Sequence, residues 1–206
     1  IRNFAKSNYK SVIEINFVLQ KQYKDIFDDG FEVDTIIKNI SLKNPNLEFI
    51  AGDTLIFFDE LQDCANCATS LKSFNQDGRY DVICSGSLMG INYNEIESNS
   101  VGNKEDYEMY SMDFEEFLWA KGYKEEQIEN LFEHMKNLTP FSDTELSVMF
   151  NNFKEYMIIG GMPAIVNLFV KRNNYSGTLK MQRQIIQDYE EDITKYAGRI
   201  RSWKNS

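Results

Sequence analysis

The stretch TLIFFDELQ, residues 54–62, is an apolar run that ends in two adjacent carboxylates, Asp59 and Glu60. Its apolar part favours a strand that is buried on both faces of a sheet. Such a strand can deliver acidic side chains to a site at its carboxyl end. The alternative is a buried strand that runs into an acidic surface turn, and this segment alone leaves both interpretations open.

Strands and helices alternate around this run. Residues 11–17, SVIEINF, alternate apolar and polar side chains as a strand does. A helix is predicted over 33–42 from its apolar spacing, and another over 64–75. A second short strand follows at 80–84. This alternation predicts an α/β fold with a mostly parallel sheet that is covered on both faces.

The second short strand ends in Ser85-Gly86-Ser87, directly after its last apolar residues. Because the carboxyl ends of parallel strands meet at one edge of a sheet, Ser85 is expected in the same crevice as Asp59 and Glu60. Taken alone, Ser-Gly-Ser is also ordinary chemistry for a strand that runs into a loop. The order of the two strands favours a common site.

The second half of the chain has a helical pattern. After a further predicted strand at 107–112, Asp113 has the chemistry of a helix N-cap, and Gly122 stops the helix. Most of the remaining residues are helical in pattern, and the double glycine and proline at 160–163 mark a helix stop and restart. We therefore predict an α/β domain at 1–122 and an all-helical region at 123–206.

Composition narrows the class of protein. The 206 residues are 42% hydrophobic and 14% aromatic, which is enough for a substantial core. No stretch approaches the ~18 consecutive apolar residues of a membrane-spanning helix, so no membrane contact is expected. The net charge of −10 argues against nucleic-acid binding by the surface as a whole. Residues 171–206 are nevertheless basic, which suits an acidic partner, nucleic acid, or simply a solvated helix face.

The three cysteines are an odd, low count that is typical of a reducing compartment, so a cytoplasmic location is predicted. Cys64 and Cys67 form a lone CxxC. A zinc site needs four ligands, and only Cys84 and His134 remain, both distant in sequence. The cysteines are therefore expected to be structural, and His134 to be a surface residue.

Three motifs in order resemble one prokaryotic family, the AAA-type ATP-binding proteins that carry a C-terminal domain of unknown function. They are FFDELQ at 57–62, GRYDVICSGSLMG at 78–90 and MYSMDFEEFLWA at 109–120. The stretches GGMPA at 160–164 and YEEDITKY at 189–196 resemble the family's helical linker and the start of its C-terminal domain. The resemblance implies an incomplete RecA/AAA-like, mostly parallel sheet followed by an all-helical region.

The same resemblance implies ATP and Mg²⁺ as ligands. Asp59 would hold Mg²⁺ through the water shell of the metal, and Glu60 would orient or deprotonate the attacking water. Ser85 would sense the γ-phosphate, with Ser87 as the second candidate. The alternative is a non-enzymatic, ATP-dependent interaction module or a nucleic-acid-binding module. The basic tail and the lack of an arginine at 100–104 keep that alternative open.

No GxxxxGK[ST] phosphate-binding loop occurs in these 206 residues. Residues 4–6 resemble the end of the helix that follows this loop in the family, so the loop is expected to precede Ile1. Without its backbone N–H groups and lysine, weak ATP binding is expected. The strand before the loop is expected to belong between the two strands that end in Asp59 and Ser85. Its loss would expose sheet edges, which favours self-association or an unusual strand order.

Overall fold

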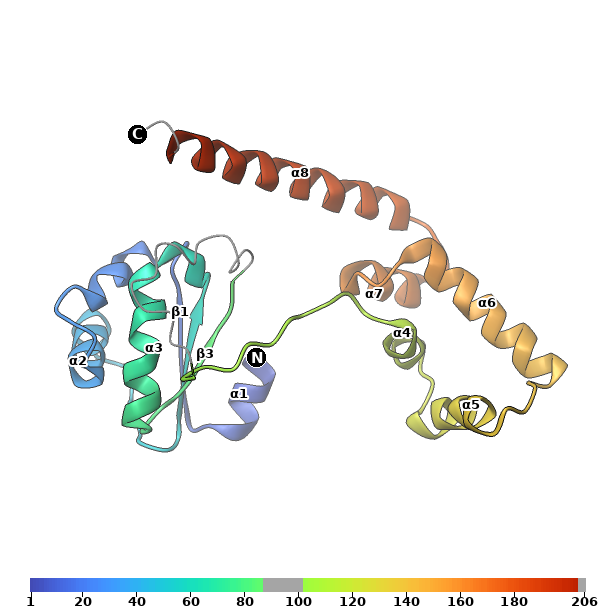
Figure 1. Ribbon diagram of the computed structural model, residues 1–206, viewed down its shortest axis with the longest axis horizontal. Coiled ribbons are helices and arrows are strands. Elements are labelled where there is room, and N and C mark those ends of the chain that lie inside the picture. The colour runs from blue at the N-terminus through green and yellow to red at the C-terminus, as the bar shows by residue number, and fades with distance from the viewer. Residues whose placement is uncertain (87–101, 204–206) are drawn as a thin grey trace. The chain divides into compact units, whose positions relative to one another are not determined.

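The computed structural model describes residues 1–86 and 102–203, and of residues 192 and 195–203 it describes the backbone. The chain folds into two compact units, Ile1–Tyr107 and Glu108–Ser206. Each unit has its own secondary-structure elements (Figure 1) and its own hydrophobic core.

A three-stranded parallel sheet forms the centre of the first unit. Its strands are β1 (Ser11–Asn16), β2 (Thr54–Asp59) and β3 (Asp81–Cys84). The sheet has the order β1-β2-β3, so β2 is paired on both sides. Asn16 lies level with Asp59, and Phe58 lies level with Cys84. The predicted α/β fold with a parallel sheet is confirmed.

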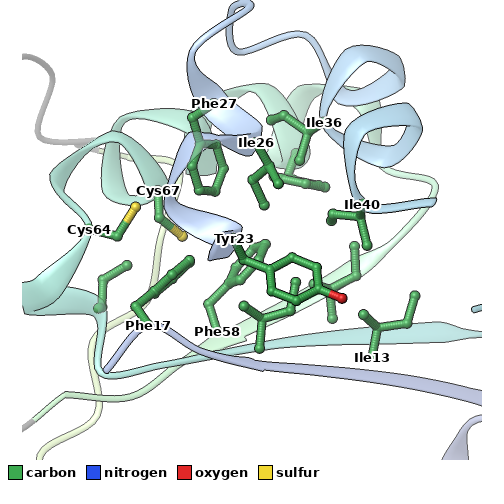
Figure 2. Close-up of a cluster of buried hydrophobic side chains, with 14 of the residues drawn as sticks. Ile13, Phe17, Tyr23, Ile26, Phe27, Ile36, Ile40, Phe58, Cys64 and Cys67 are labelled. Carbon is green, nitrogen blue, oxygen red and sulfur yellow. The ribbon is translucent and has the colours of Figure 1, made fainter. Parts of the chain in front are cut away.

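The helical segments of this unit are α1 (Arg2–Asn8), the 3-10 helices η1 (Lys21–Phe27) and η2 (Leu61–Asp63), α2 (Val33–Lys43) and α3 (Ala65–Asp77). Alternate residues of β1, Ile13 and Ile15, are buried in one core with side chains of η1, α2 and α3 (Figure 2). Phe58 lies in this core, with its ring centroid 5.6 Å from that of Phe17 and 6.0 Å from that of Phe27. The aromatic cluster therefore joins β2 to η1 and to the end of β1.

The prediction that a missing strand belongs between the strands that end in Asp59 and Ser85 is wrong. β2 and β3 pair directly, with Leu55 level with Asp81 at one end and Phe58 level with Cys84 at the other. A strand has two hydrogen-bonding edges, and both edges of β2 are used by β1 and β3. A further strand would have to pair with the outer edge of β1 or of β3.

The second unit is helical throughout the residues that the structure describes. Its helices are α4 (Phe114–Ala120), α5 (Glu125–Asn137), α6 (Asp143–Ile159), α7 (Pro163–Arg172) and α8 (Thr178–Trp203). Their core is formed by Phe117, Ile159, Ile165, Val166 and Phe169. At the start of α4, the Asp113 side chain accepts a hydrogen bond from the backbone N–H of Glu116, and Glu116 caps Asp113 in return. Asp113 is thus the N-cap that the sequence predicts.

The predicted strand at 107–112 is wrong. No strand pairs with this segment among the described residues, and Tyr107, Met109 and Tyr110 are exposed. Met112 instead joins the helical unit, because its backbone N–H donates to the Gly161 carbonyl at 2.7 Å and its carbonyl accepts from the Tyr156 hydroxyl at 2.9 Å. A segment without a neighbouring strand cannot form a ladder, whatever its residue pattern.

The two compact units divide between Tyr107 and Glu108, ahead of the boundary that the sequence places at Gly122. Helix α4 contacts both α6 and α7, and its Phe117 is fully buried in their core. That packing assigns α4 to the helical unit. No helix in the described part of the chain has both the length and the apolar character that a membrane crossing requires.

The predicted helix stop and restart at 160–163 is confirmed, since α6 ends at Ile159 and α7 begins at Pro163. Gly160 has φ 69° and ψ −175°, a conformation that is essentially restricted to glycine. Gly161 is needed for a different reason. A Cβ at this position would lie 1.9 Å from the Met112 carbonyl oxygen, so only a residue without a side chain allows this contact.

We expect Gly161→Ala to destabilise the helical unit by about 3 kcal/mol or more, because the added Cβ forces Met112 away and breaks its hydrogen bond. Gly122→Ala is the matched control. Gly122 has φ 96° but no atom within 4 Å of an added Cβ, so only about 1–2 kcal/mol of backbone strain is expected. Urea unfolding followed by circular dichroism measures both, and equal losses would contradict the close contact.

Candidate functional site

Three polar side chains from the three strands meet at the carboxyl edge of the sheet. Asn16 ends β1, Asp59 ends β2, and Ser85 directly follows β3. The Ser85 hydroxyl donates to Asp59 Oδ1 at 2.5 Å, and Asn16 Nδ2 donates to Asp59 Oδ2 at 2.7 Å. Both oxygens of one half-buried carboxylate are therefore held by neighbouring strands. We call Asn16, Asp59 and Ser85 the strand-end triad.

The backbone of the sheet positions this triad. Beyond the strands, Phe17 N–H donates to the Asp59 carbonyl at 3.1 Å, and Ser85 N–H donates to the Phe58 carbonyl at 3.0 Å. Because successive side chains of a strand point to opposite faces, burial of Phe58 in the core turns Asp59 to the other face. There it meets the side chain of Asn16, which lies level with it.

Asn16 is the member of the triad that was not singled out from the sequence. Its Oδ1 accepts hydrogen bonds from the backbone N–H groups of Val18 and Leu19, at 3.0 and 2.9 Å. This turn fixes the orientation of the amide, so that Nδ2 faces Asp59. The available signal was its place as the last polar residue of the alternating strand predicted over 11–17, next to the predicted crevice.

Glu60 lies beside the triad, but its carboxylate has another partner. Its backbone N–H donates to Asp59 Oδ1 at 3.1 Å, whereas its Oε2 accepts from Gln62 Nε2 at 2.5 Å. Glu60 has φ 60° and ψ 48°, a left-handed conformation that is uncommon for residues other than glycine. The structure therefore places Asp59 and Ser85 in direct contact and directs Glu60 toward Gln62. Ser87, the second candidate sensor, lies outside the described residues.

An ion pair lies on the same face of the sheet as Asp59. Arg2 of α1 donates from Nε to Glu14 Oε2 at 2.9 Å. The hydrogen bond with Glu14 is the main cause that raises the pKa of Arg2, and the charge of Asp59 contributes more weakly. The same guanidinium lowers the pKa of Glu14. Both residues are accessible to solvent, so this pair adds little stability and mainly brings one positive charge toward the edge of the sheet.

The donor set at this edge fits Mg²⁺ bound through water. Mg²⁺ prefers oxygen ligands, keeps several of its waters, and is commonly bound by one or two carboxylates together with phosphate oxygens. Asp59 supplies a carboxylate that Ser85 and Asn16 orient, and its Oδ2, which has two lone pairs, accepts a hydrogen bond from Asn16. No cluster of three His, Cys, Asp or Glu side chains suited to a metal occurs in the part of the chain that the structure describes.

The cysteines line the core. Cys64 and Cys67 are buried at the start of α3, and Cys84 packs against the same cluster (Figure 2). Burial raises the pKa of the Cys64 thiol to about 11, and burial also raises the pKa of Cys67. Thiols with such pKa values are almost entirely protonated near neutral pH, which disfavours nucleophilic chemistry and metal ligation.

His134 is less isolated than the sequence suggests. Its ring is half-buried, with Nδ1 3.2 Å from the Thr139 hydroxyl and the ring centroid 4.7 Å from that of Phe141. Nε2 lies 3.6 Å from Glu145 Oε1, at the start of α6. These contacts join α5 to α6, so His134 has a packing role within the helical unit.

Comparison with known proteins identifies the family of the first unit. A family model described as an AAA domain matches residues 1–118, which is more than half of the chain. The chain belongs to the AAA domain family. A second model, a domain of unknown function (DUF8612), matches residues 150–204. No curated protein and no solved structure matches the chain significantly.

Membership of the AAA family assigns the first unit to a nucleotide-binding, P-loop type of domain. The match ends within α4, shortly after the unit that carries the strand-end triad. The second match covers most of α6 and all of α7 and α8. The sequence resemblance to an AAA-type protein with a C-terminal domain of unknown function is confirmed.

Asn16→Asp tests the hydrogen bond between Asn16 and Asp59. The new carboxylate can still accept from Val18 and Leu19, but it faces Asp59 as a like charge. We expect a loss of about 1.5–3 kcal/mol in unfolding free energy at neutral pH, the range for a hydrogen bond to a charged group. Repulsion between the two carboxylates favours a proton shared by the pair. Once that proton is bound the repulsion is relieved, so the folded state regains stability at low pH. The deficit should therefore shrink as the pH falls toward about 4.

Asn137→Asp is the matched control for this change. Asn137 Nδ2 also donates to a carboxylate, Glu133 Oε2 at 3.1 Å, but both residues are exposed on α5. A small and nearly pH-independent effect is expected there. If Asn16→Asp costs no more than Asn137→Asp at neutral pH, the triad does not hold Asp59 as described.

Proposed function

We propose that this chain is the core of an ATP-binding protein whose complete form is a Mg²⁺-dependent ATPase. The observation that carries the proposal is the carboxylate of Asp59, oriented by Ser85 and Asn16 at the carboxyl edge of a parallel sheet. Ligands of open α/β sheets bind outside the carboxyl ends of the strands. Membership of the AAA family supports nucleotide as that ligand.

In this proposal, Asp59 assists Mg²⁺ through the water shell of the metal. When bound, Mg²⁺ would neutralise negative charge on the phosphates. Ser85 has two tasks. Its hydroxyl orients Asp59, and its position at the tip of β3 suits a side chain that reports the presence of the γ-phosphate. Ser87 is kept as the second candidate for that sensing role.

Glu60 is proposed as the general base that orients and deprotonates the attacking water. The residue follows Asp59 directly, and its left-handed backbone conformation ends the extended strand, so its side chain does not follow the alternation of the side chains of β2. Gln62 donates to Oε2, which leaves Oε1 as the oxygen for a water molecule. Gln62 Oε1 is buried without a hydrogen-bond partner among the described residues, so the hydrogen bond from Nε2 is what joins this amide to Glu60.

Binding of the ATP phosphates requires a phosphate-binding loop in addition to Asp59, Glu60 and Ser85. These 206 residues contain no GxxxxGK[ST] loop, whose backbone N–H groups and lysine hold the phosphates in P-loop proteins. We therefore propose that tight ATP binding requires a phosphate-binding loop outside these residues, and that this chain alone binds ATP weakly. In sequence, we propose the nucleotide-binding domain at 1–122 and a helical region that leads into a C-terminal domain at 123–206, although α4 packs with the helical unit.

The proposed location is the cytoplasm. All three cysteines are free thiols, and the two at the start of α3 are buried in the core. Proteins of reducing compartments retain such thiols, whereas secreted domains of this size more often use disulfides.

Two measurements test this function. Isothermal titration of Mg-ATP into the 206-residue chain should give weak or undetectable binding. The protein extended to include its phosphate-binding loop should release phosphate, and Glu60→Gln should lower kcat by about 10²–10⁴-fold, the usual contribution of a general base. Nucleotide binding should persist in that variant, because the base does not contact the phosphates in the ground state.

Glu48→Gln is the control for Glu60→Gln, because Glu48 is an exposed acid remote from the carboxyl ends of the strands. Low-micromolar affinity of the 206-residue chain for Mg-ATP would contradict the need for the loop. Unchanged turnover in Glu60→Gln would remove the catalytic assignment. Binding without any turnover in the extended wild-type protein would instead favour the non-enzymatic, ATP-dependent interaction module.

A further inference from the structure

Helix α8 presents an apolar stripe that its own unit does not cover. Leu179, Ile186, Tyr189 and Ile193 are 56%, 57%, 57% and 67% exposed. We call these four residues the α8 stripe. Large apolar side chains that are gathered along one line of a helix are typical of a surface that another helix covers.

The contacts between α8 and its own unit lie mostly beside the stripe, and Gln182, between Leu179 and Ile186, is the position in line with the stripe that also contacts the unit. Met181 and Ile185 contact the core around Phe117, and Thr178 is buried at the start of the helix. The Gln182 amide donates to the carbonyls of Ile158 and Ile159 at the end of α6, at 3.0 and 3.1 Å. These contacts occupy the first two turns, so they hold α8 in place and leave the stripe exposed along its side.

The spacing of the stripe identifies the kind of partner. Leu179, Ile186 and Ile193 follow one another every seven residues, and Tyr189 lies three residues after Ile186. In the sequence, the same a and d pattern continues with Tyr196, Ile200 and Trp203. A hydrophobic repeat of seven residues matches another helix of the same repeat, because the two helices then supercoil with their stripes in contact.

Charge complementarity selects a second copy in an antiparallel arrangement. Arg183 and Glu190 both flank the stripe, at equivalent positions of successive heptads, and both are exposed. When Ile186 faces Tyr189 of a second copy, Arg183 of each helix comes next to Glu190 of the other. The two-fold axis forms this ion pair twice.

A parallel pair does not have this complementarity. It would place the acidic turn at 188–192 level with the same turn of the second copy, so like charges would face each other. Residues 178–203 contain five Lys or Arg and four Asp or Glu, so the helix is nearly neutral although the whole chain has a net charge of −10. Charge repulsion between two copies of α8 is therefore weak.

We propose that the α8 stripe is a self-association surface, on which α8 of a second copy of this chain packs antiparallel through Leu179, Ile186, Tyr189 and Ile193. The interface is isologous, so each copy contributes the same patch and the assembly closes as a dimer. This surface is distinct from the sheet edges of the first unit and requires no nucleotide.

Sedimentation velocity of the 206-residue chain over a range of concentrations tests the dimer. The wild type should approach twice the chain mass of 24.1 kDa as concentration rises. Ile186→Lys combined with Ile193→Lys should weaken self-association by about a hundredfold or more, because each copy loses two buried apolar side chains. Circular dichroism verifies that the variant keeps its helix content and melting temperature.

Met135→Lys combined with Leu146→Lys is the matched control. These two residues are 66% and 55% exposed on α5 and α6, so the change adds the same charge to the same unit at equally exposed apolar positions. Association should be unaffected. A wild type that stays monomeric at all concentrations overturns the proposal. A dimer that persists in the Ile186→Lys, Ile193→Lys variant also overturns it and places the contact elsewhere, for example at a sheet edge.

Charge exchange tests the antiparallel arrangement without altering the stripe. Arg183→Glu and Glu190→Arg should each weaken the dimer by about fivefold, since each creates two like-charge contacts. The double variant should restore wild-type association, because the ion pairs reform with their signs reversed. Additive weakening in the double variant would exclude the antiparallel pair.

Discussion

Pairing of β2 on both of its edges is the constraint on which the candidate site depends. β1 and β3 run parallel to β2 and in a fixed register, so the ends of all three strands reach one edge of the sheet. Asp59 therefore meets an amide from one neighbour and a hydroxyl from the other. A slip of one residue in either pairing would turn these groups to the opposite face. The aromatic cluster around Phe58 opposes such a slip, because Phe58 must remain on the core side.

The carboxylate of Asp59 combines partial burial with a fixed orientation at this edge. A half-buried charge is costly unless hydrogen bonds replace the lost water, and three donors surround Asp59: Ser85, Asn16 and the N–H of Glu60. The same donors hold the carboxylate in one orientation, which a water-mediated metal contact needs. Glu60 is controlled separately, through its left-handed backbone and Gln62. Two adjacent acids thus acquire different surroundings, which suits two different roles.

The helical unit is organised around a contact between backbones. Gly161 and Met112 approach so closely that no side chain fits between them. Asp113, the N-cap of α4, follows Met112, and the buried Phe117 lies at the end of the first turn of that helix. This contact draws the segment before α4 into the helical unit. Helix α8 is anchored on the same core at its first turns and exposes an apolar stripe beyond them. The unit therefore combines a closed core with one helix face that is suited to a partner.

Local pattern was sufficient to predict the parallel α/β sheet, the acids at the end of β2, the N-cap at Asp113 and the helix break at 160–163. Each of these depends on residues that are close together in the chain, through alternation, capping chemistry or glycine and proline. Strand order, the contact of Asn16 with Asp59, the packing of Met112 on the helical unit and the assignment of α4 were decided only by the tertiary structure. They depend on partners that are distant in sequence, and a hydrogen bond or a core contact exists only when the fold brings both partners together.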